Sequence, residues 1–321
     1  MDEKLLKILR RHRDGFISGQ DLAHKLSLSH TTIARRIHKL RKEGYDIQTQ
    51  PHLGYKLVAL PDKLLAQELG WCLDTKVIGQ KNLSYDTVDS TNSLAFSLAN
   101  RGAPCGTAVF AEGQRKGKGR LGRRWVSPKG QGIYLSLILR PQIVSDEAML
   151  ITLLAALSCA ETIRKVCGLK AQIKWPNDIL VNSKKVCGIL TEMYVEANIV
   201  KFIILGIGIN VNTPNSKLPL GASSLREEVK GKRKFSRLEL ARELLRQLDK
   251  EYHHFKDKGS LKLIARWRNL SAFSGKRVKV SFAHETIEGQ AQDIDEQGAL
   301  IVRLDNGFKQ HVLAGDVMRV R

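Results

Sequence analysis

The apolar residues near the N-terminus recur at helical spacing. Leucines and one isoleucine between positions 5 and 9 give a first predicted helix an apolar face. Ser18, with Asp21 three residues further on, resembles a capping box, in which side chains of the first helical turn bond to free backbone N–H groups. The pattern therefore predicts a second helix that runs through Leu26.

A third predicted helix has one apolar and one basic face. Ser29 stands at its start as an N-cap, Ile33, Ile37 and Leu40 follow at i, i+4 and i+7, and Gly44 ends it as a C-cap. The other face carries His30, Arg35, Arg36, Lys39, Arg41 and Lys42. No acid occurs between residues 27 and 42, so this face is strongly cationic.

Two extended runs, residues 47–50 and 55–58, flank a turn at residues 51–54 and predict a β-hairpin. Three helices followed by a hairpin make a winged helix-turn-helix, whose third helix is the expected reader of the DNA major groove. Its candidate DNA contacts are Ser29, Thr31, Thr32, Arg35, Arg36 and Lys39. The alternative is a basic, solvated helix in a small accessory domain. We favour DNA binding because the acid-free face coincides with the recognition position.

The rest of the chain changes its periodicity twice. Residues 133–139 are almost wholly apolar and predict a central strand, whereas residues 148–160 predict a core helix that is too short to cross a bilayer. From about residue 271 the pattern becomes short strands, with a tight-turn signal at residues 305–307. We therefore expect an α+β chain. The predicted domains are a winged helix-turn-helix (residues 1–60), a mixed α/β domain (61–270) and a small β-barrel (271–321).

The composition of the chain says more about its binding partners than about its fold. The formal net charge of the 321 residues is +21, which favours a polyanionic partner or anionic ligands. The five cysteines are scattered and lack a C-x-x-C pair, which is typical of reduced thiols in a cytoplasmic protein. The nine histidines show no metal-ligand spacing, and the N-terminus has no apolar signal region. We expect neither a metal site nor a membrane partner.

The main candidate for chemistry is the stretch from Gly113 to Trp125, which contains four glycines, six basic residues and no acid. Glycines let the backbone approach a ligand closely, and interleaved Arg and Lys add donors for phosphate or carboxylate. The stretch therefore predicts a site for an anionic small molecule, although a solvated loop or a nucleic-acid contact would have the same composition. It lacks the spacing of a Walker loop. It does spell G-x-G-x-x-G, but Pro128 and Gly130 argue against the helix that a dinucleotide site needs.

Read as G-K-G-R-x-G-R-x-W, this stretch resembles the signature of biotin protein ligases. Four other strings match the same family in the expected order: Asp-Ser-Thr-Asn at 89–92, Lys-Trp-Pro-Asn-Asp at 174–178, Lys-Val-Cys-Gly-Ile-Leu at 185–190 and Gly-x-Gly-x-Asn at 206–210. The N-terminal winged helix matches the bifunctional members, which also repress the biotin operon. The resemblance covers essentially the whole chain.

The resemblance implies a class II synthetase-like catalytic domain and an SH3-like C-terminal barrel. It also implies the reaction: Mg²⁺–ATP activates biotin to biotinyl-5′-AMP, and a lysine of the biotin carboxyl carrier protein of acetyl-CoA carboxylase then accepts the biotinyl group. Biotin is both substrate and corepressor ligand, operator DNA is the second partner, and a homodimer is expected when the adenylate is bound.

The site residues are likewise implied by position in the family. The catalytic pair is Lys185 and Arg120. The biotin ligands are Ser90, Thr91, Asn92, Gln114, Lys118, Gly119, Arg120 and Lys185, with the valeryl chain along Leu190 and Ile207. The nucleotide ligands are Lys118, Arg120, Arg123, Asn177 and Asn210.

Two departures from the family pattern stand out. Lys118 replaces the usual first arginine of the loop and lacks its bidentate fork, so adenylate retention is expected to be looser. The wing turn at residues 51–54 lacks the usual second glycine and lysine, which makes operator recognition less secure than ligation. Two alternative functions remain: a ligand-sensing repressor without ligase activity, and a lipoate-type acyl-protein ligase. The operator sequence, the affinities and the ligand-free oligomeric state do not follow from the sequence.

Overall fold

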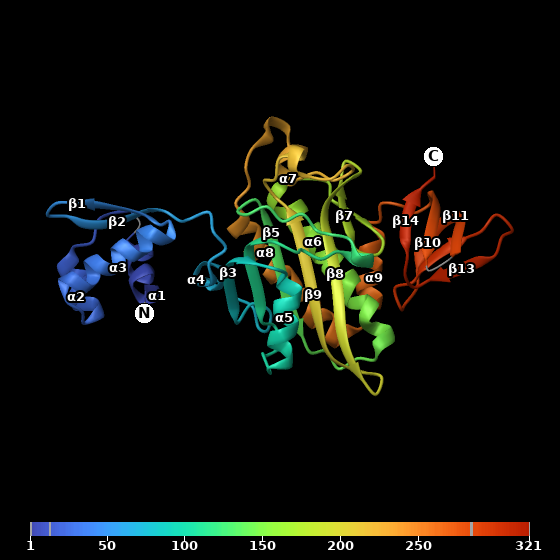
Figure 1. The fold of residues 1–321 in the computed structure, drawn as a ribbon, viewed down its shortest axis with the longest axis horizontal. Helices are drawn as coiled ribbons and strands as arrows, with labels where there is room; N and C mark the ends of the chain where they lie inside the picture. Colours follow the sequence, from blue (N-terminus) through green and yellow to red (C-terminus); the bar gives the residue numbers. More distant parts are fainter. Residues whose placement is uncertain (1, 13, 283–284, 321) are drawn as a thin grey trace. The chain divides into compact units, whose positions relative to one another are not determined.

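The computed structural model describes residues 2–12, 14–282 and 285–320. This part of the chain divides into two compact units, with the division between Lys63 and Leu64 (Figure 1). The larger unit holds both the central sheet and the C-terminal strands. No helix among the described residues is long and apolar enough to cross a membrane.

The first unit is the predicted winged helix-turn-helix. Its elements are α1 (Asp2–Arg11), α2 (Gly19–Leu26), α3 (His30–Glu43), β1 (Asp46–Gln50) and β2 (Gly54–Ala59). Ser18 and Ser29 are N-caps, accepting from the backbone N–H groups of Asp21 (3.0 Å) and Thr32 (3.3 Å). The apolar face of α3 is fully buried, which leaves its basic face turned outward.

A glycine makes the wing possible. Gly54 follows the turn with a φ of +104°, and a Cβ at this position would lie 2.1 Å from the carbonyl oxygen of Ile17. The backbones of Ile17 and Tyr55 bond to each other in both directions, so the loop before α2 joins the wing as a third extended segment. The predicted hairpin is therefore anchored to the helical part of the unit.

The second unit is built on a mixed sheet with the described strand order β3-β4-β5-β9-β8-β7-β6. The strands are β3 (Asn82–Val88), β4 (Ala108–Gln114), β5 (Gly132–Leu139), β6 (Gln172–Lys174), β7 (Asp178–Val181), β8 (Lys184–Glu196) and β9 (Ile199–Asn210). Only β3 and β4 pair in parallel among the described strands. Every residue of β5 is buried, as its apolar run predicts for a central strand.

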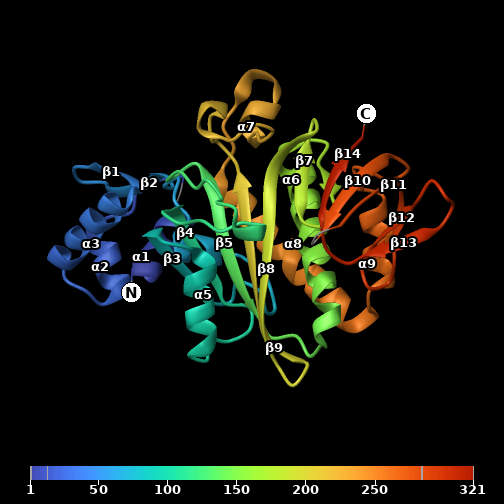
Figure 2. The ribbon, with the colours of Figure 1, turned by 45° about the vertical axis from the view of Figure 1, so that its right-hand side comes forward.

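Helices cover both faces of this sheet (Figure 2). The helices of the larger unit in the described chain are α4 (Ala66–Gly70), α5 (Thr91–Asn100), α6 (Ala148–Cys167), α7 (Leu225–Glu228), α8 (Arg237–Lys258) and α9 (Leu261–Arg268), of which the short α7 lies beyond the ends of the strands. Helix α5 packs on one face through Ala95 and Ala99, against Ile138 and Ile204. Helices α6 and α8 pack together on the other side, and most of α6 is buried, as predicted for a core helix.

Two buried carboxylates hold the start of the larger unit in place. Glu112 on β4 pairs with Arg237 on α8 (2.8 Å), whose side chain is 1% exposed, and also accepts from the backbone N–H of Leu64 (2.7 Å). Asp249 accepts three backbone N–H bonds from residues 76–78. Buried charges are tolerated when they are paired in this way. The segment after the division between the units is therefore tied to the sheet and to α8.

The C-terminal strands form a second, antiparallel sheet. In the described chain these are β10 (Arg277–Phe282), β11 (Glu285–Ile294), β12 (Leu300–Arg303), β13 (Lys309–Val312) and β14 (Asp316–Arg319), in the order β13-β12-β11-β10-β14. The sheet docks on the central region through Gly298, whose carbonyl accepts from the indole of Trp175 (3.0 Å). The start of β14 also contacts the central region, because Asp316 pairs with Arg123.

Candidate active site

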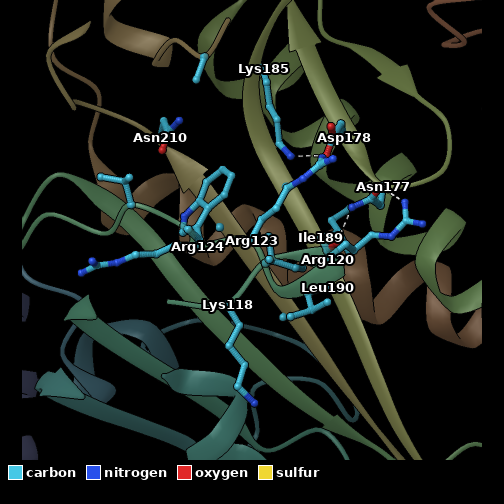
Figure 3. A pocket seen from close by; sticks show the side chains of 18 of the residues that line it. Lys118, Arg120, Arg123, Arg124, Asn177, Asp178, Lys185, Ile189, Leu190 and Asn210 are labelled. Atoms are coloured by element: carbon cyan, nitrogen blue, oxygen red, sulfur yellow. Dashed lines mark hydrogen bonds and ion pairs between the residues drawn. The ribbon is translucent and has the colours of Figure 1, made fainter. Parts of the chain in front are cut away.

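A cavity of about 390 Å³ lies over the central strands of the larger unit (Figure 3). Its walls come from the first turn of α5, the loop after β4, the strands β8 and β9, and the start of β14. It is lined by every small-ligand residue that the sequence predicts: Ser90, Thr91, Asn92, Gln114, Lys118, Gly119, Arg120, Arg123, Asn177, Lys185 and Asn210. Leu190 and Ile207 line it as well.

Glycines on two adjacent strands make the floor of this pocket. Gly188 of β8 is paired with Gly208 of β9, and Leu190 with Gly206. A Cβ at Gly208 would lie 2.4 Å from the indole nitrogen of Trp125, so the ring packs directly on the backbone. The Gly-x-Gly string thus serves close packing of Trp125 onto the strands, and the same side chain lines the pocket.

A hydrogen-bonded polar cluster closes one end of the pocket. Gln114 accepts from the backbone N–H of Thr91 (2.8 Å) and donates to Ser127 (2.9 Å). Ser136 of β5 donates to Oδ1 of Asn92 (2.6 Å) and lies 2.8 Å from the hydroxyl of Thr91. Gln114 is half-buried and the other four side chains are buried, so their hydrogen bonds set their orientation before any ligand binds.

Ser90 lies beside this cluster and caps helix α5. It is the N-cap of α5 and accepts weakly from the backbone N–H of Ser93 (3.5 Å). The helix therefore begins at the pocket, with its N-terminal N–H groups at the wall. The capping role and the pocket-lining position coincide at this residue.

Glu192 joins the polar cluster to the basic loop. One carboxylate oxygen accepts from Nδ2 of Asn92 (2.7 Å), and the other lies 3.3 Å from the ammonium of Lys118. Sequence reasoning missed Glu192, Ser127 and Ser136. Each is a single polar residue in an extended run, with no local motif to single it out.

The basic loop contains a short turn, η1 (Arg120–Gly122), and makes no helix. Arg120 donates to Asn177 (2.9 Å) and to the carbonyl of Gly315 (3.3 Å), while Arg123 pairs with Asp316 (2.5 Å). Gly315 and Asp316 belong to the C-terminal region, which sequence reasoning did not connect to the pocket. Both arginines are thus held by groups that an anionic ligand could replace.

Lys185 projects from β8 into the same space, as Figure 3 shows. Its ammonium lies 2.6 Å from Asp178 and 5.5 Å from the centre of the Trp125 ring. Asn177 is fixed by donation to the carbonyl of Ile189 (2.8 Å), and Asn210 by donation to Ser223 (3.0 Å). The pocket therefore has a strand-borne cation between two oriented amides.

Thiol chemistry does not fit this site. The thiol of Cys187, beside Lys185 in sequence, is completely buried, and burial together with a hydrogen bond involving Cys159 raises its pKa well above the usual range. A protonated, inaccessible thiol is a poor nucleophile. The described residues contain no cluster of three or more potential metal ligands, and the pocket carboxylates Asp178 and Asp316 are already paired with cations.

The candidate DNA contacts lie in the separate N-terminal unit. The hydroxyl of Ser29 lies 3.0 Å from that of Thr31 and 2.8 Å from that of Thr32, so these three side chains first serve the cap of α3. Arg35 is exposed and Arg36 half-buried. Lys39 is exposed and lies 3.9 Å from Glu43. The structure places all six on one helix.

Three family profiles match the chain in order. Residues 2–56 match "HTH domain", residues 84–210 match "Biotin/lipoate A/B protein ligase family", and residues 273–319 match "Biotin protein ligase C terminal domain".

Similar proteins span almost the whole chain. "Bifunctional ligase/repressor BirA" of Bacillus subtilis is 35% identical over 95% of each chain. The protein of the same name from Escherichia coli is 32% identical over 95% of this chain and 94% of its own. Among solved structures, "Biotin protein ligase from Aquifex aeolicus in complex with biotin and ATP" is similar, with a TM-score of 0.64 and 28% identity. It covers 75% of this chain and 99% of that one.

Proposed function

The chain belongs to the biotin protein ligase family, in its bifunctional ligase/repressor branch, and from this premise we propose how its residues divide the work. The protein activates biotin with ATP to biotinyl-5′-AMP and transfers the biotinyl group to a lysine of the biotin carboxyl carrier protein of acetyl-CoA carboxylase. It also represses the biotin operon in response to biotin. The observation that carries the ligase function is the meeting of all the expected small-ligand residues around one cavity.

The polar cluster is proposed to hold the ureido head of biotin. Ser90, Thr91, Asn92 and Gln114 offer donors and acceptors at the closed end of the pocket. The flat floor beside Leu190 and Ile207 suits the apolar valeryl chain. This direction would bring the carboxylate of biotin towards Lys118, Gly119, Arg120 and Lys185.

The nucleotide is proposed to lie on the other side of Trp125. Oδ1 of Asn210 is buried without a partner among the described residues, and the residue lines the pocket, so a bound base could satisfy it. Arg120, Arg123 and Lys118 would contact the phosphates, with Asn177 steadying Arg120. Mg²⁺ would enter the site bound to the phosphates of ATP.

Catalysis in this arrangement is positioning plus charge stabilisation. A carboxylate oxygen of biotin attacks the α-phosphorus and pyrophosphate leaves; the carrier lysine then attacks the acyl carbon and AMP leaves. Both residues line the pocket, and we propose that Lys185 stabilises the negative charge that grows on the α-phosphate and that Arg120 retains the adenylate between the steps. Aligned partners and fixed donors suffice for such displacements.

The repressor half is proposed to use α3, with Ser29, Thr31, Thr32, Arg35, Arg36 and Lys39 facing operator DNA. Reading two half-sites requires two copies, so we propose a homodimer that forms through the central sheet when the adenylate is bound. The domain limits 1–60, 61–270 and 271–321 complete this proposal. Support for them comes from the division after Lys63 and the three matched segments. Because the proposed partners are the carrier protein and operator DNA, we propose that the protein acts in the cytoplasm.

Pyrophosphate exchange tests the ligase. The purified protein should exchange labelled pyrophosphate into ATP when biotin is added, and much less with lipoate. Exchange with lipoate alone would favour a lipoate-type ligase. No exchange with either acid would favour a repressor without ligase activity.

Truncation tests the separation of the two functions. Deletion of residues 1–60 should leave carrier biotinylation intact, because the ties of Leu64 to Glu112 and of residues 76–78 to Asp249 remain. DNA retardation should be lost. The intact protein should bind DNA more tightly with biotin and ATP, and binding should weaken steeply with salt. Specific DNA binding by the truncated protein would contradict the repressor assignment.

A further inference from the structure

We propose that Glu192 is a positioning residue for biotin capture, setting the amide of Asn92 and tethering the basic loop through Lys118. The proposal rests on the function proposed above. It starts from a carboxylate that touches both the polar cluster and the loop, with bonds of 2.7 Å to Asn92 and 3.3 Å to Lys118. No other acid links those two parts of the pocket in the described chain.

The orientation of Asn92 depends on what faces each end of its amide. Oδ1 accepts from Ser136, and Nδ2 donates to Glu192 and, more weakly, to the carbonyl of Leu190 (3.4 Å). A carboxylate only accepts, so it excludes the flipped amide, in which two acceptors would face each other. Glu192 therefore decides which polar atoms Asn92 presents at the closed end of the pocket.

The alternation of side chains along β8 explains why the side chain of residue 192 reaches the polar cluster. Side chains alternate along β8, so Gly188, Leu190 and Glu192 share one face. The first two form the pocket floor, and Glu192 is paired with Ile204, a core residue beneath α5. Gly206 leaves the room that Asn92 needs, since a Cβ there would lie 2.1 Å from its Oδ1. Glu192 thus lies between the pocket floor and the first turn of α5.

The same carboxylate offsets the unusual residue of the loop. Lys118 stands where the family usually has arginine, and an ammonium acts as a point charge without the guanidinium fork. The pair with Glu192 is half-exposed, with side chains 45% and 33% accessible, so it is a weak and reversible tether. The loop can therefore open for biotin and close again, with Lys118 returning to Glu192 on β8.

The experiment compares five variants of the full-length protein. Glu192→Ala removes both contacts of the carboxylate, and Glu192→Gln keeps an acceptor for Asn92 but removes the charge. Lys118→Met removes the tether together with a cation that is proposed to contact the ligand, so its comparison with Glu192→Gln, alone and in the double variant, uses loop cleavage in the ligand-free protein. Glu196→Gln is the matched control, because it neutralises an acid of the same strand whose lysine partner, Lys201, lies 3.1 Å away and outside the pocket. Biotin affinity, biotinyl-adenylate release and tryptic cleavage of the ligand-free loop are measured for each.

Glu192→Ala should weaken biotin binding about 10- to 100-fold, the usual range for a lost bond to a charged group, and should raise KM for biotin far more than it lowers kcat. Glu192→Gln should keep biotin affinity within about threefold. Its adenylate release and loop cleavage should rise roughly two- to fivefold, as for an exposed ion pair. In the ligand-free protein, Lys118→Met should raise loop cleavage to the same extent as Glu192→Gln, with no additive effect in the double variant.

Each half of the proposal has its own contradicting result. Unchanged biotin affinity in Glu192→Ala overturns the role at Asn92; if that variant does not fold, a loss of affinity above tenfold in Glu192→Gln does so instead. Additive effects of Glu192→Gln and Lys118→Met on loop cleavage in the ligand-free protein, or equal loop cleavage in Glu192→Gln and Glu196→Gln, overturn the tether. Failure of the ligase assignment looks different, because the unmodified protein would then show no biotin-dependent pyrophosphate exchange.

Discussion

The polar cluster and the basic loop of the pocket are held by different kinds of contact. In the polar cluster, Ser136 and Asn92 are 0% and 4% exposed and bond to each other, in places fixed by strand pairing and by the first turn of α5. In the loop, Arg123 is 69% exposed and is held by an ion pair to another region of the chain. Buried hydrogen bonds resist exchange, whereas exposed ion pairs are weak and screened by salt. The difference suits a site that recognises one small molecule rigidly and releases pyrophosphate.

Removing the strand-borne cation should have the largest effect. Lys185→Ala should slow adenylate formation by about 10² to 10³, the typical cost of one lost charge-stabilising donor. Folding should be little affected, because the side chain is partly exposed and its pair with Asp178 lies at the pocket wall. Single-turnover pyrophosphate release measures the step.

In Lys185→Ala, adenylate formation should fail while transfer to the carrier protein remains. Adenylate that is supplied ready-made should still be transferred to the carrier by Lys185→Ala at a rate close to normal. Full-rate pyrophosphate release, or an equal loss in both steps, would contradict the assignment of the strand side to adenylation.

A loop substitution should act on retention. Arg120→Gly removes a guanidinium that bonds to Asn177 and Gly315, and with it a charge-assisted contact to the adenylate of roughly 1.5–3 kcal/mol. Adenylate should dissociate about 10 to 100 times faster and label bystander lysines. A dissociation assay measures the release, and unchanged retention would exclude the role of Arg120.

The sequence predicted what short motifs and periodicity encode. Caps at Ser18 and Ser29, the apolar strand β5 and the core helix α6 all follow from local patterns, and the structure confirms them. The glycine-rich loop could be chosen as the centre of the site because its composition is unusual over a single stretch. The motifs around Asn92, Lys185 and Asn210 predicted further residues that line the pocket.

What the sequence did not reveal are contacts between distant single residues. Glu192 meets Asn92 across 100 positions of the chain, and Asp316 meets Arg123 across 193. Such pairs depend on strand register and on the docking of the C-terminal sheet, which no local pattern specifies. A lone acid in a strand is usually solvated, so nothing marked either residue beforehand. The half-exposed carboxylates that hold the cations of the site were for this reason harder to predict than the cations themselves.

The pair of Arg123 with Asp316 gives the smallest and most discriminating prediction. An ion pair of this exposure contributes about 0.2–1 kcal/mol, so Asp316→Asn should open the ligand-free loop roughly two- to fivefold more often. Tryptic cleavage within the loop tracks that open population when closing is fast. With biotinyl-5′-AMP bound, the phosphate should replace Asp316 as the partner of Arg123, and the two proteins should then be cleaved at the same low rate. If the variant is still cleaved faster with adenylate bound, Arg123 keeps Asp316 as its partner, and the loop does not exchange its contacts in the way its exposure suggests.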